Sequence, residues 1–220
     1  MPDDPLKSSK RVLEPHERIS EVLFGLIMVL TFTGSLSVAE AGREDVRAML
    51  VGALGCNFAW GIIDGVLYLM GSLAEKGRHL SLLRALRKTT ESPKAQRLIS
   101  AALPPLIASV LQPAEFENIH QRLNQTPEPP ARARFNKDDW LAAVGVFLWV
   151  FLTTFPVAIP FIVLHNAKQA MRVSNAVAVA MLFIAGIAYG RSVGRSAFGF
   201  GFAMVVLGGV LVALTIALGG

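Results

Sequence analysis

Long apolar stretches separated by short polar segments dominate the pattern of this chain. Five such stretches contain 110 of the 220 residues, and within them the only formal charge is that of Asp64. They cover residues 22–39, 48–73, 140–164, 173–190 and 196–218. A helix needs about 20 apolar residues to cross the hydrocarbon core of a bilayer, where only helices and closed barrels pair all their backbone groups. The pattern therefore predicts an all-α, polytopic membrane protein with five transmembrane helices.

Composition excludes several other classes of protein. Hydrophobic residues make up 53% of the chain and charged residues only 17%, against roughly 25% charged residues in soluble domains. A single soluble domain and a disordered chain are therefore excluded, and one cysteine excludes a disulfide scaffold. A transmembrane β-barrel would need short alternating strands. The chain has no phosphate-binding loop, no cysteine pair and no His-Glu-x-x-His motif, so we expect neither an enzyme nor a bound cofactor.

The polar segments divide the chain into four parts. Residues 1–20 form a polar N-terminal arm, 21–73 carry the first two membrane helices, 74–139 form an insert, and 140–220 carry the last three helices. The arm lacks the early apolar core of a signal peptide. We therefore expect the first membrane helix to be an uncleaved anchor.

Lysine and arginine are distributed unevenly between the two sides of this arrangement. Alternating the five helices across the membrane places 17 of these residues on one side and 4 on the other. Because cytoplasmic loops are enriched in lysine and arginine, the N-terminus and the insert are predicted to be cytoplasmic and the C-terminus to lie outside. The net charge of +5 then faces anionic lipid of the bilayer, and we expect no nucleic-acid partner.

The insert is predicted to consist of short helices. Their pattern indicates one amphipathic helix over 79–90, a second from Ser92-Pro93, a short third over 106–111 and a fourth from Gln112-Pro113, before a linker over 126–134. Two interpretations of this insert remain open, a basic subdomain resting on lipid headgroups and a regulatory or metal-collecting subdomain. Glu117 and His120 share a helix face, but we expect a solvated face there rather than a metal site.

Asp64 is the strongest functional candidate. A carboxylate inside a bilayer costs about 2.5–3.5 kcal/mol on insertion scales, so such residues usually bind a cation, carry a proton or pair with a buried partner. A protonated Asp64 that is only hydrogen-bonded to a neighbouring helix is the alternative. Asn57 and Tyr68 lie near the same side of the helix. Counting from the inner helix ends places Met28 within one turn of Asp64 in height.

Two further features of the membrane stretches bear on function. Glu21 stands at the inner end of the first helix, where a carboxylate also stabilises the helix N-terminus without any other role. Pro156 and Pro160 interrupt the third stretch, and each removes a backbone donor and bends the helix. In membranes such breaks are tolerated where neighbouring helices or a cavity satisfy the freed carbonyls.

Several segments resemble the vacuolar iron transporter family. EVLFGL (21–26) is similar to the opening of the family's first helix, and PVAIPF (156–161), Ala170, Ser174 and LFIAG (182–186) resemble its proline-containing stretch and the helix after it. The resemblance covers about 130 residues of membrane sequence. It implies two membrane helices, a cytoplasmic helical insert and three further helices, in a divergent bacterial-type member of the inner membrane. It also implies a homodimer that exports or sequesters ferrous iron, and manganese, in exchange for protons.

The chain departs from the family at the residues that bind metal. The family's first-helix aspartate would fall at Met28, its second-helix glutamate at Asn57, and the usually acid-rich insert is basic here. We therefore expect Asp64 as the central metal ligand or proton carrier, Asn57 as an assisting oxygen ligand, Met28 as a soft ligand and Glu21 as a further candidate. Two alternatives remain open: a non-transporting anchored protein whose basic insert binds lipid or a partner, and a transporter of an organic cation.

Overall fold

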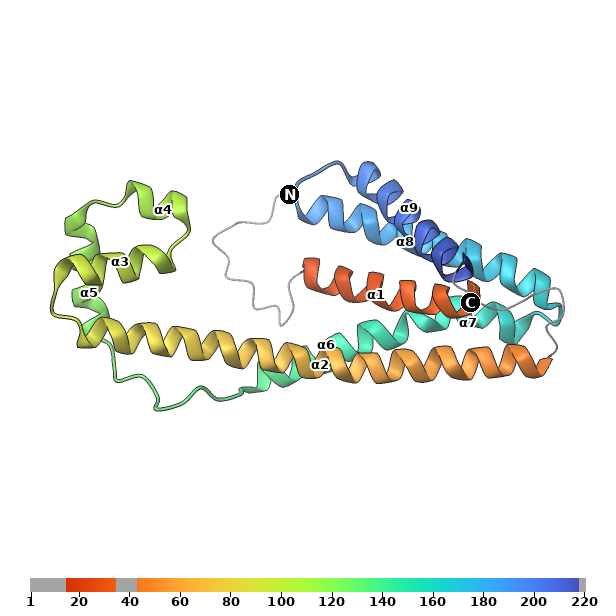
Figure 1. The fold of residues 1–220 in the computed structure, drawn as a ribbon, viewed down its shortest axis with the longest axis horizontal. Helices are drawn as coiled ribbons and strands as arrows, with labels where there is room; N and C mark the ends of the chain where they lie inside the picture. Colours follow the sequence, from red (N-terminus) through yellow and green to blue (C-terminus); the bar gives the residue numbers. More distant parts are fainter. Residues whose placement is uncertain (1–14, 35–42, 218–220) are drawn as a thin grey trace. The chain divides into compact units, whose positions relative to one another are not determined.

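A computed structural model describes residues 15–34 and 43–217, and every element in them is an α-helix (Figure 1). The helices are α1 (Pro15–Gly34), α2 (Arg43–Lys88), α3 (Ser92–Ala102), α4 (Pro105–Val110), α5 (Pro113–Gln125), α6 (Lys137–Leu152), α7 (Thr154–Val163), α8 (Ala167–Ser192) and α9 (Ala197–Ala217). Most of the predicted N-terminal arm and the last three residues lie outside the described part.

The described chain divides into two compact units. The membrane unit contains the residues up to Tyr68 and those from Lys137 onward, and the insert unit contains Leu69–Asn136. Three helical segments are long and apolar enough to cross a membrane: Glu44–Lys88, Lys137–Val163 and Ala167–Ser192. Two shorter apolar segments, Ile19–Leu30 and Ala197–Leu211, accompany them among the described residues. The prediction of an all-helical membrane protein is thus confirmed, with three helices that are candidate spans by length and composition.

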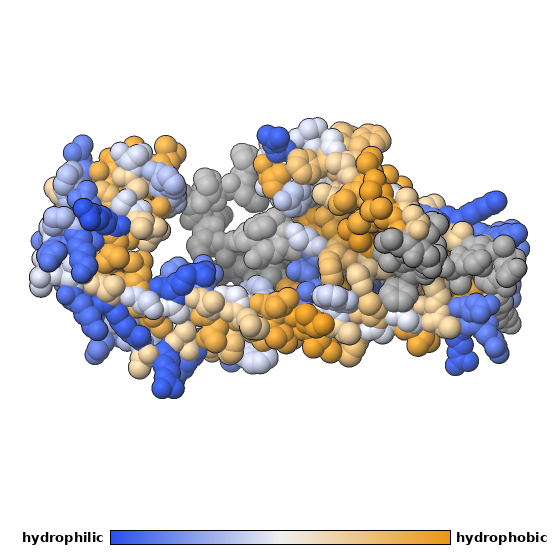
Figure 2. All heavy atoms as spheres, viewed as in Figure 1, coloured by the Kyte–Doolittle hydropathy of each residue, from blue (hydrophilic) through white to orange (hydrophobic). Residues whose placement is uncertain are grey.

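The surface of the membrane unit is apolar. Exposed large hydrophobic side chains occur on α2, α6, α7, α8 and α9, and apolar side chains cover much of the visible surface of these helices (Figure 2). In water such a surface would drive association. In lipid it is the expected exterior, because acyl chains replace water around it.

α2 is one continuous helix of 46 residues. The prediction of a separate amphipathic helix over 79–90 is therefore wrong. The connecting residues 74–78, Ala-Glu-Lys-Gly-Arg, contain no proline and only one glycine, which costs about 1 kcal/mol in a helix and is too weak to end it. Acidic residues in the first turn and basic residues in the last turn also complement the helix dipole.

The third apolar stretch is broken into α6 and α7 at Thr153. Pro156 has no N–H to donate to the carbonyl of Leu152, and its ring conflicts with that carbonyl in an uninterrupted helix. Pro160 lies inside α7. The predicted interruption of this stretch is confirmed, and it places two consecutive threonines, 153 and 154, at the break.

The core of the membrane unit is centred on α1. Buried apolar side chains of α1, α2, α7 and α8 form one cluster: Leu26, Val29, Leu30, Ala53, Val157, Ala178 and Leu182. Small residues among them allow the helices to approach closely, and close approach is the main source of helix association in lipid.

The insert unit has a small core of its own. Leu86, Ala95, Ile99 and Phe116 form a buried cluster, and the predicted helix starts at Ser92 and at Gln112-Pro113 are confirmed. Gln112 donates its backbone N–H to Glu115 Oε2 at 2.6 Å, which closes the capping box of α5. The insert helices are therefore fixed by local sequence signals and by one shared apolar cluster.

The expectation of a solvated face at Glu117 and His120 is half wrong. His120 is only 6% exposed, and its Nε2 lies 2.9 Å from the carbonyl oxygen of Leu86. Glu117 instead accepts a hydrogen bond from Ser92 Oγ at 2.8 Å on the exposed side. The two side chains therefore have different partners, and among the described residues no group of three His, Cys, Asp or Glu side chains gathers around them.

α8 and α9 pack through glycines at close range. A Cβ added to Gly186 would lie 2.6 Å from the carbonyl oxygen of Phe200 and 2.8 Å from Gly201 Cα. Both atoms belong to the backbone of α9, so they cannot rotate away as a side chain does. The contact therefore requires glycine at position 186.

We predict that Gly186→Ala destabilises the protein. Overpacking of this kind costs about 1–3 kcal/mol, and the thermal unfolding midpoint of the detergent-purified protein measures it. Gly209→Ala on α9 is the matched control, since its added Cβ would meet nothing within 4 Å, and it should leave the midpoint unchanged or raise it. Equal midpoints for the two variants would show that α8 and α9 do not make this contact.

Candidate functional site

Asn57 joins three helices of the membrane unit. Its side chain is completely buried, and its Nδ2 donates to the carbonyl oxygen of Gly25 at 3.2 Å and to Thr154 Oγ1 at 2.5 Å. These partners stand 32 and 97 residues away in the sequence, on α1 and at the start of α7. One amide on α2 thus links α1 to the break between α6 and α7.

Gly25 allows α1 to approach Asn57 and the break between α6 and α7. A Cβ at position 25 would lie 2.1 Å from Thr153 Oγ1 and 2.6 Å from the carbonyl oxygen of Val150. Thr153 Oγ1 itself donates to that Val150 oxygen at 2.7 Å, so the helix break satisfies part of its own backbone. α1 therefore passes directly against the polar break, and the backbone oxygen of Gly25 reaches Asn57.

The amide oxygen of Asn57 has no hydrogen-bond partner in residues 15–34 and 43–217. Asn57 Oδ1 is buried and accepts no hydrogen bond from the described part of the chain. Leaving a buried polar atom unpaired costs about 1–3 kcal/mol, so such an atom in a native protein indicates a ligand, an ion or water. Asn57 Oδ1, the Gly25 carbonyl and Thr154 Oγ1 are the kinds of uncharged oxygen that hard cations accept as ligands.

Asp64 lies on the same helix, two turns closer to the predicted cytoplasmic side. It is partly buried, and its Oδ2 is buried without a hydrogen-bond partner among the described residues. Seven residues along a helix correspond to about 10 Å, whereas metal–oxygen distances are about 2.0–2.6 Å. Asn57 and Asp64 of one chain therefore stand at two separate levels along α2.

Tyr68, the third residue of the predicted polar side, packs instead against apolar residues. It lies against Ala142 and Val146 of α6. Gly65, next to Asp64, is equally close to α6, since an added Cβ would lie 3.1 Å from the carbonyl oxygen of Ala143. The middle of α2 is therefore held against α6 by small residues, with Asp64 at the edge of that contact.

The height of Met28 differs from the expectation, and Glu21 lies inside α1, which begins at Pro15 rather than at Glu21. α1 and α2 run in opposite directions (Figure 1), and two contacts fix their register, the Gly25–Asn57 bond and the ring pair of Phe24 and Trp60, 5.5 Å apart. Met28 is thus one turn outward of Asn57 and roughly 15 Å from the level of Asp64. The expectation that Met28 lies within one turn of Asp64 in height is therefore wrong, because counting from helix ends did not fix the register.

Glu21 comes closer to the level of Asp64. From the Gly25–Asn57 contact, Glu21 lies four residues inward on α1 and Asp64 seven residues inward on α2, so their levels differ by about 4–5 Å. Two carboxylates therefore stand at similar depth on adjacent segments of the membrane unit. Among the described residues no group of three His, Cys, Asp or Glu side chains gathers to hold a metal ion.

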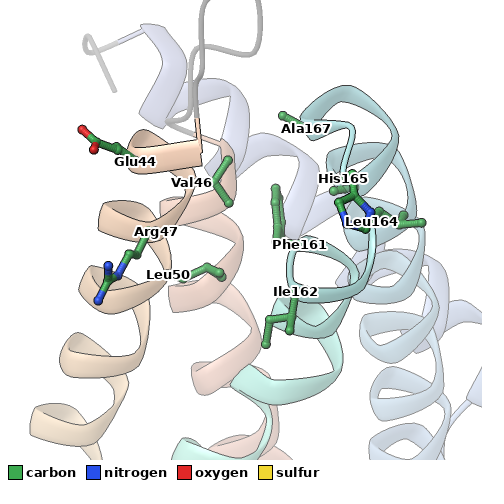
Figure 3. Close-up of a pocket in the computed structure, with 10 residues that line it drawn as sticks. Glu44, Val46, Arg47, Leu50, Phe161, Ile162, Leu164, His165 and Ala167 are labelled. Atoms are coloured by element: carbon green, nitrogen blue, oxygen red, sulfur yellow. The ribbon is translucent and has the colours of Figure 1, made fainter.

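A cavity of about 620 Å³ opens at the other end of the membrane unit. Val46 and Leu50 project from α2 toward Phe161 and Ile162 of α7, and His165 stands in the turn that follows α7 (Figure 3). Glu44 and Arg47 project from the other side of α2 (Figure 3). The cavity lies outward of Asn57, on the same side of it as Met28.

Sequence reasoning missed Gly25 and Thr154 as partners of Asn57. Thr154 had one usable signal, its place two residues before Pro156, where a helix break exposes polar groups. Ser174, quoted only for its resemblance, has a structural task, because its buried Oγ donates to the carbonyl oxygen of Val157 at 2.7 Å. The proline-containing α7 is thus supported by polar side chains from both α2 and α8.

Comparison with known proteins gives one family. The sequence model of the VIT family matches residues 73–220, two thirds of the chain. The match contains Thr154 and the whole of α6–α9, but neither Asn57 nor Asp64. No curated protein is significantly similar to the chain.

We predict that Asn57 and Thr154 are energetically coupled. In a double-mutant cycle of Asn57→Leu and Thr154→Val, the coupling energy should be about 0.6–1.7 kcal/mol, the range measured for hydrogen bonds between membrane helices. Unfolding free energies from denaturant titration in detergent provide the measurement. The same cycle with Thr153→Val is the control, because Thr153 Oγ1 bonds within its own helix break. Additive effects of Asn57→Leu and Thr154→Val would contradict the contact.

Proposed function

Because the chain belongs to the VIT family, the vacuolar iron transporters, we propose that this membrane transporter of metal ions moves ferrous iron or manganese out of the cytoplasm in exchange for protons. The observation that carries this proposal is the buried, unpartnered oxygen of Asn57 between three membrane helices. It lies on the same helix as Asp64, the only formal charge of the apolar stretches.

The polar groups suggest an order of binding along the membrane unit. A cation from the cytoplasmic side would first meet the carboxylate level of Glu21 and Asp64. It would then pass to Asn57 Oδ1, supported by the Gly25 carbonyl and Thr154 Oγ1. Met28 lies one turn further outward, and the cavity beside Phe161 and His165 forms the outer end.

The ligand chemistry supports a hard divalent cation. Carboxylate, amide and carbonyl oxygens suit manganese and other hard ions, and a thioether adds affinity for softer ones. Asp64 is costly to keep charged in lipid, so it would be most stable when it binds either the cation or a proton. Such alternation would couple the movement of metal to the counter-movement of protons.

We propose five membrane spans, formed by α1, α2, the broken pair α6–α7, α8 and α9. The two shorter apolar segments in α1 and α9 and the distribution of lysine and arginine support this count, with the insert in the cytoplasm of a bacterial cell. We also propose a homodimer, as the family resemblance implies. Ile62, Ile63 and Val66 are exposed on α2 around the partly buried Asp64, and a second copy would shield that carboxylate.

We predict that transport depends on both polar levels. In proteoliposomes containing a metal-sensitive dye, Asp64→Asn and Asn57→Leu should each lower ferrous-iron or manganese flux at least about tenfold, since tenfold corresponds to about 1.4 kcal/mol and each change removes a ligand or charge of that order. Glu75→Gln is the matched control. It removes an exposed carboxylate of α2 outside the proposed path and should leave the flux unchanged.

The alternatives give different outcomes in the same vesicles. Wild-type flux no higher than that of empty vesicles would favour the anchored, non-transporting protein. Flux of an organic cation in place of metal would favour the other transporter class. Metal flux that survives Asp64→Asn would retain a metal transporter but overturn the assignment of the inner level.

We predict the topology of the insert as a separate outcome. In a Cys56→Ser background, Glu128→Cys in the insert should be protected from a membrane-impermeant thiol reagent added to intact cells. Lys168→Cys, at the start of α8, should react. The reverse labelling pattern would contradict the proposed orientation, and labelling of both positions would contradict the five-span count.

A further inference from the structure

A basic hollow lies within the insert unit. It has a volume of about 330 Å³, between the C-terminal half of α2 and the segment that leads back toward α6. Lys76 and His79 line it from α2, and Arg132 and Arg134 line it from the returning segment. No acidic side chain of the described chain is among its lining residues. Three permanent positive charges and an imidazole therefore face one small space.

Two arginines of α2 hold the returning segment in place. Arg84 donates from one guanidinium nitrogen to the carbonyl oxygens of Pro130 at 2.8 Å and Ala131 at 2.6 Å. Arg87 donates to the backbone oxygen of Thr126, to Thr126 Oγ1 at 3.0 Å and to the carbonyl oxygen of Pro127 at 2.8 Å. Proline-rich segments offer few backbone donors, so they accept such bonds without competing for them. These hydrogen bonds hold the segment that carries Arg132 and Arg134 against α2.

Several residues that line this hollow are close in sequence to the membrane helices. Lys76 follows Leu73, the last residue of the second apolar stretch, by three residues, or about 5 Å of helix. Arg134 precedes the first residue of α6 by three residues. Both segments that link the insert to membrane helices therefore contribute cations to the same space.

We propose that this hollow binds the phosphate group of an anionic phospholipid. A guanidinium presents a planar fork of donors to phosphate oxygens, and an ammonium adds a point charge. Basic clusters immediately next to a membrane helix are the usual recognition sites for anionic headgroups. Leu80 and Ala133, also in the lining, offer apolar contact for the glycerol and upper acyl chain. A soluble phosphate compound shares the charge but has no part that matches this apolar contact.

The inference is independent of the proposed transport. It assigns the insert of this chain to an anion, whereas the proposed path takes a cation through the membrane unit. Absence of metal flux would leave the hollow intact, and absence of lipid binding would leave the path intact.

Lipid retention by the full-length protein tests the proposal. Native mass spectrometry of the detergent-purified chain, titrated with phosphatidylglycerol, gives the lipid concentration for half-maximal occupancy. The double variant Arg132→Gln/Arg134→Gln should raise this concentration about tenfold or more, because each basic residue near a headgroup contributes roughly a factor of five. Phosphatidylcholine, which has no net charge, should be retained weakly and equally by both proteins.

A control with the same loss of charge separates the hollow from general basicity. Arg97→Gln/Arg122→Gln removes two exposed arginines of α3 and α5, and it should leave phosphatidylglycerol retention unchanged. Arg84→Gln/Arg87→Gln keeps all cations of the hollow but releases the returning segment, so it should weaken retention.

Three outcomes would overturn the assignment. One is an equal loss of phosphatidylglycerol in the Arg97/Arg122 control. Another is saturation by glycerol phosphate at concentrations as low as those of the lipid, which would assign the hollow to a soluble phosphate. The third is displacement of the lipid by short RNA at comparable concentration, which would assign it to nucleic acid.

Discussion

The membrane unit depends on the requirement that polar groups in lipid find partners inside the protein. The two prolines of the third apolar stretch break the helix at Thr153 and leave backbone and hydroxyl groups in need of partners. Asn57 of α2 donates to Thr154, and Ser174 of α8 donates to the carbonyl of Val157. The absence of a side chain at Gly25 allows α1 to pack against the same break. One break thus brings four helices together around a polar centre. Within the described residues, Asn57 Oδ1 remains without a hydrogen-bond partner there.

That centre also sets the vertical order of the other polar residues. Once Asn57 is bonded to Gly25, antiparallel helix geometry assigns Glu21 and Asp64 to one side of it and Met28 to the other. Under the proposed path, a cation would occupy these levels in turn, and conduction requires binding at each site that is weak enough for the ion to leave again.

The sequence predicted the features that local signals control. Long apolar stretches indicated the membrane helices, Pro156 indicated the break, and Ser92-Pro93 and Gln112-Pro113 marked the insert helices. It failed where distant segments decide the result. The end of an apolar stretch is not the end of a helix, so α2 was divided wrongly at residue 79. A solvated face was expected at Glu117 and His120, yet the Nε2 of His120 lies 2.9 Å from the carbonyl oxygen of Leu86 in the core. The partners of Asn57 depend on a glycine and a threonine that no spacing rule connects.

The departures of this chain from its family all replace negative charge with neutral or positive side chains. Methionine and asparagine stand where the resemblance places carboxylates in the first two helices, and the insert contains eleven lysines and arginines within 74–139. Fewer carboxylates would lower the affinity for a divalent cation at each level of the proposed path, and a basic insert would repel that cation rather than collect it. The same basic residues favour contact with anionic lipid. Under the proposed path, this chain would therefore release metal more readily and select it less by charge. Selection of one metal ion over another would then depend on the arrangement of oxygen atoms at Asn57, where side-chain and backbone oxygens from three helices are held in position.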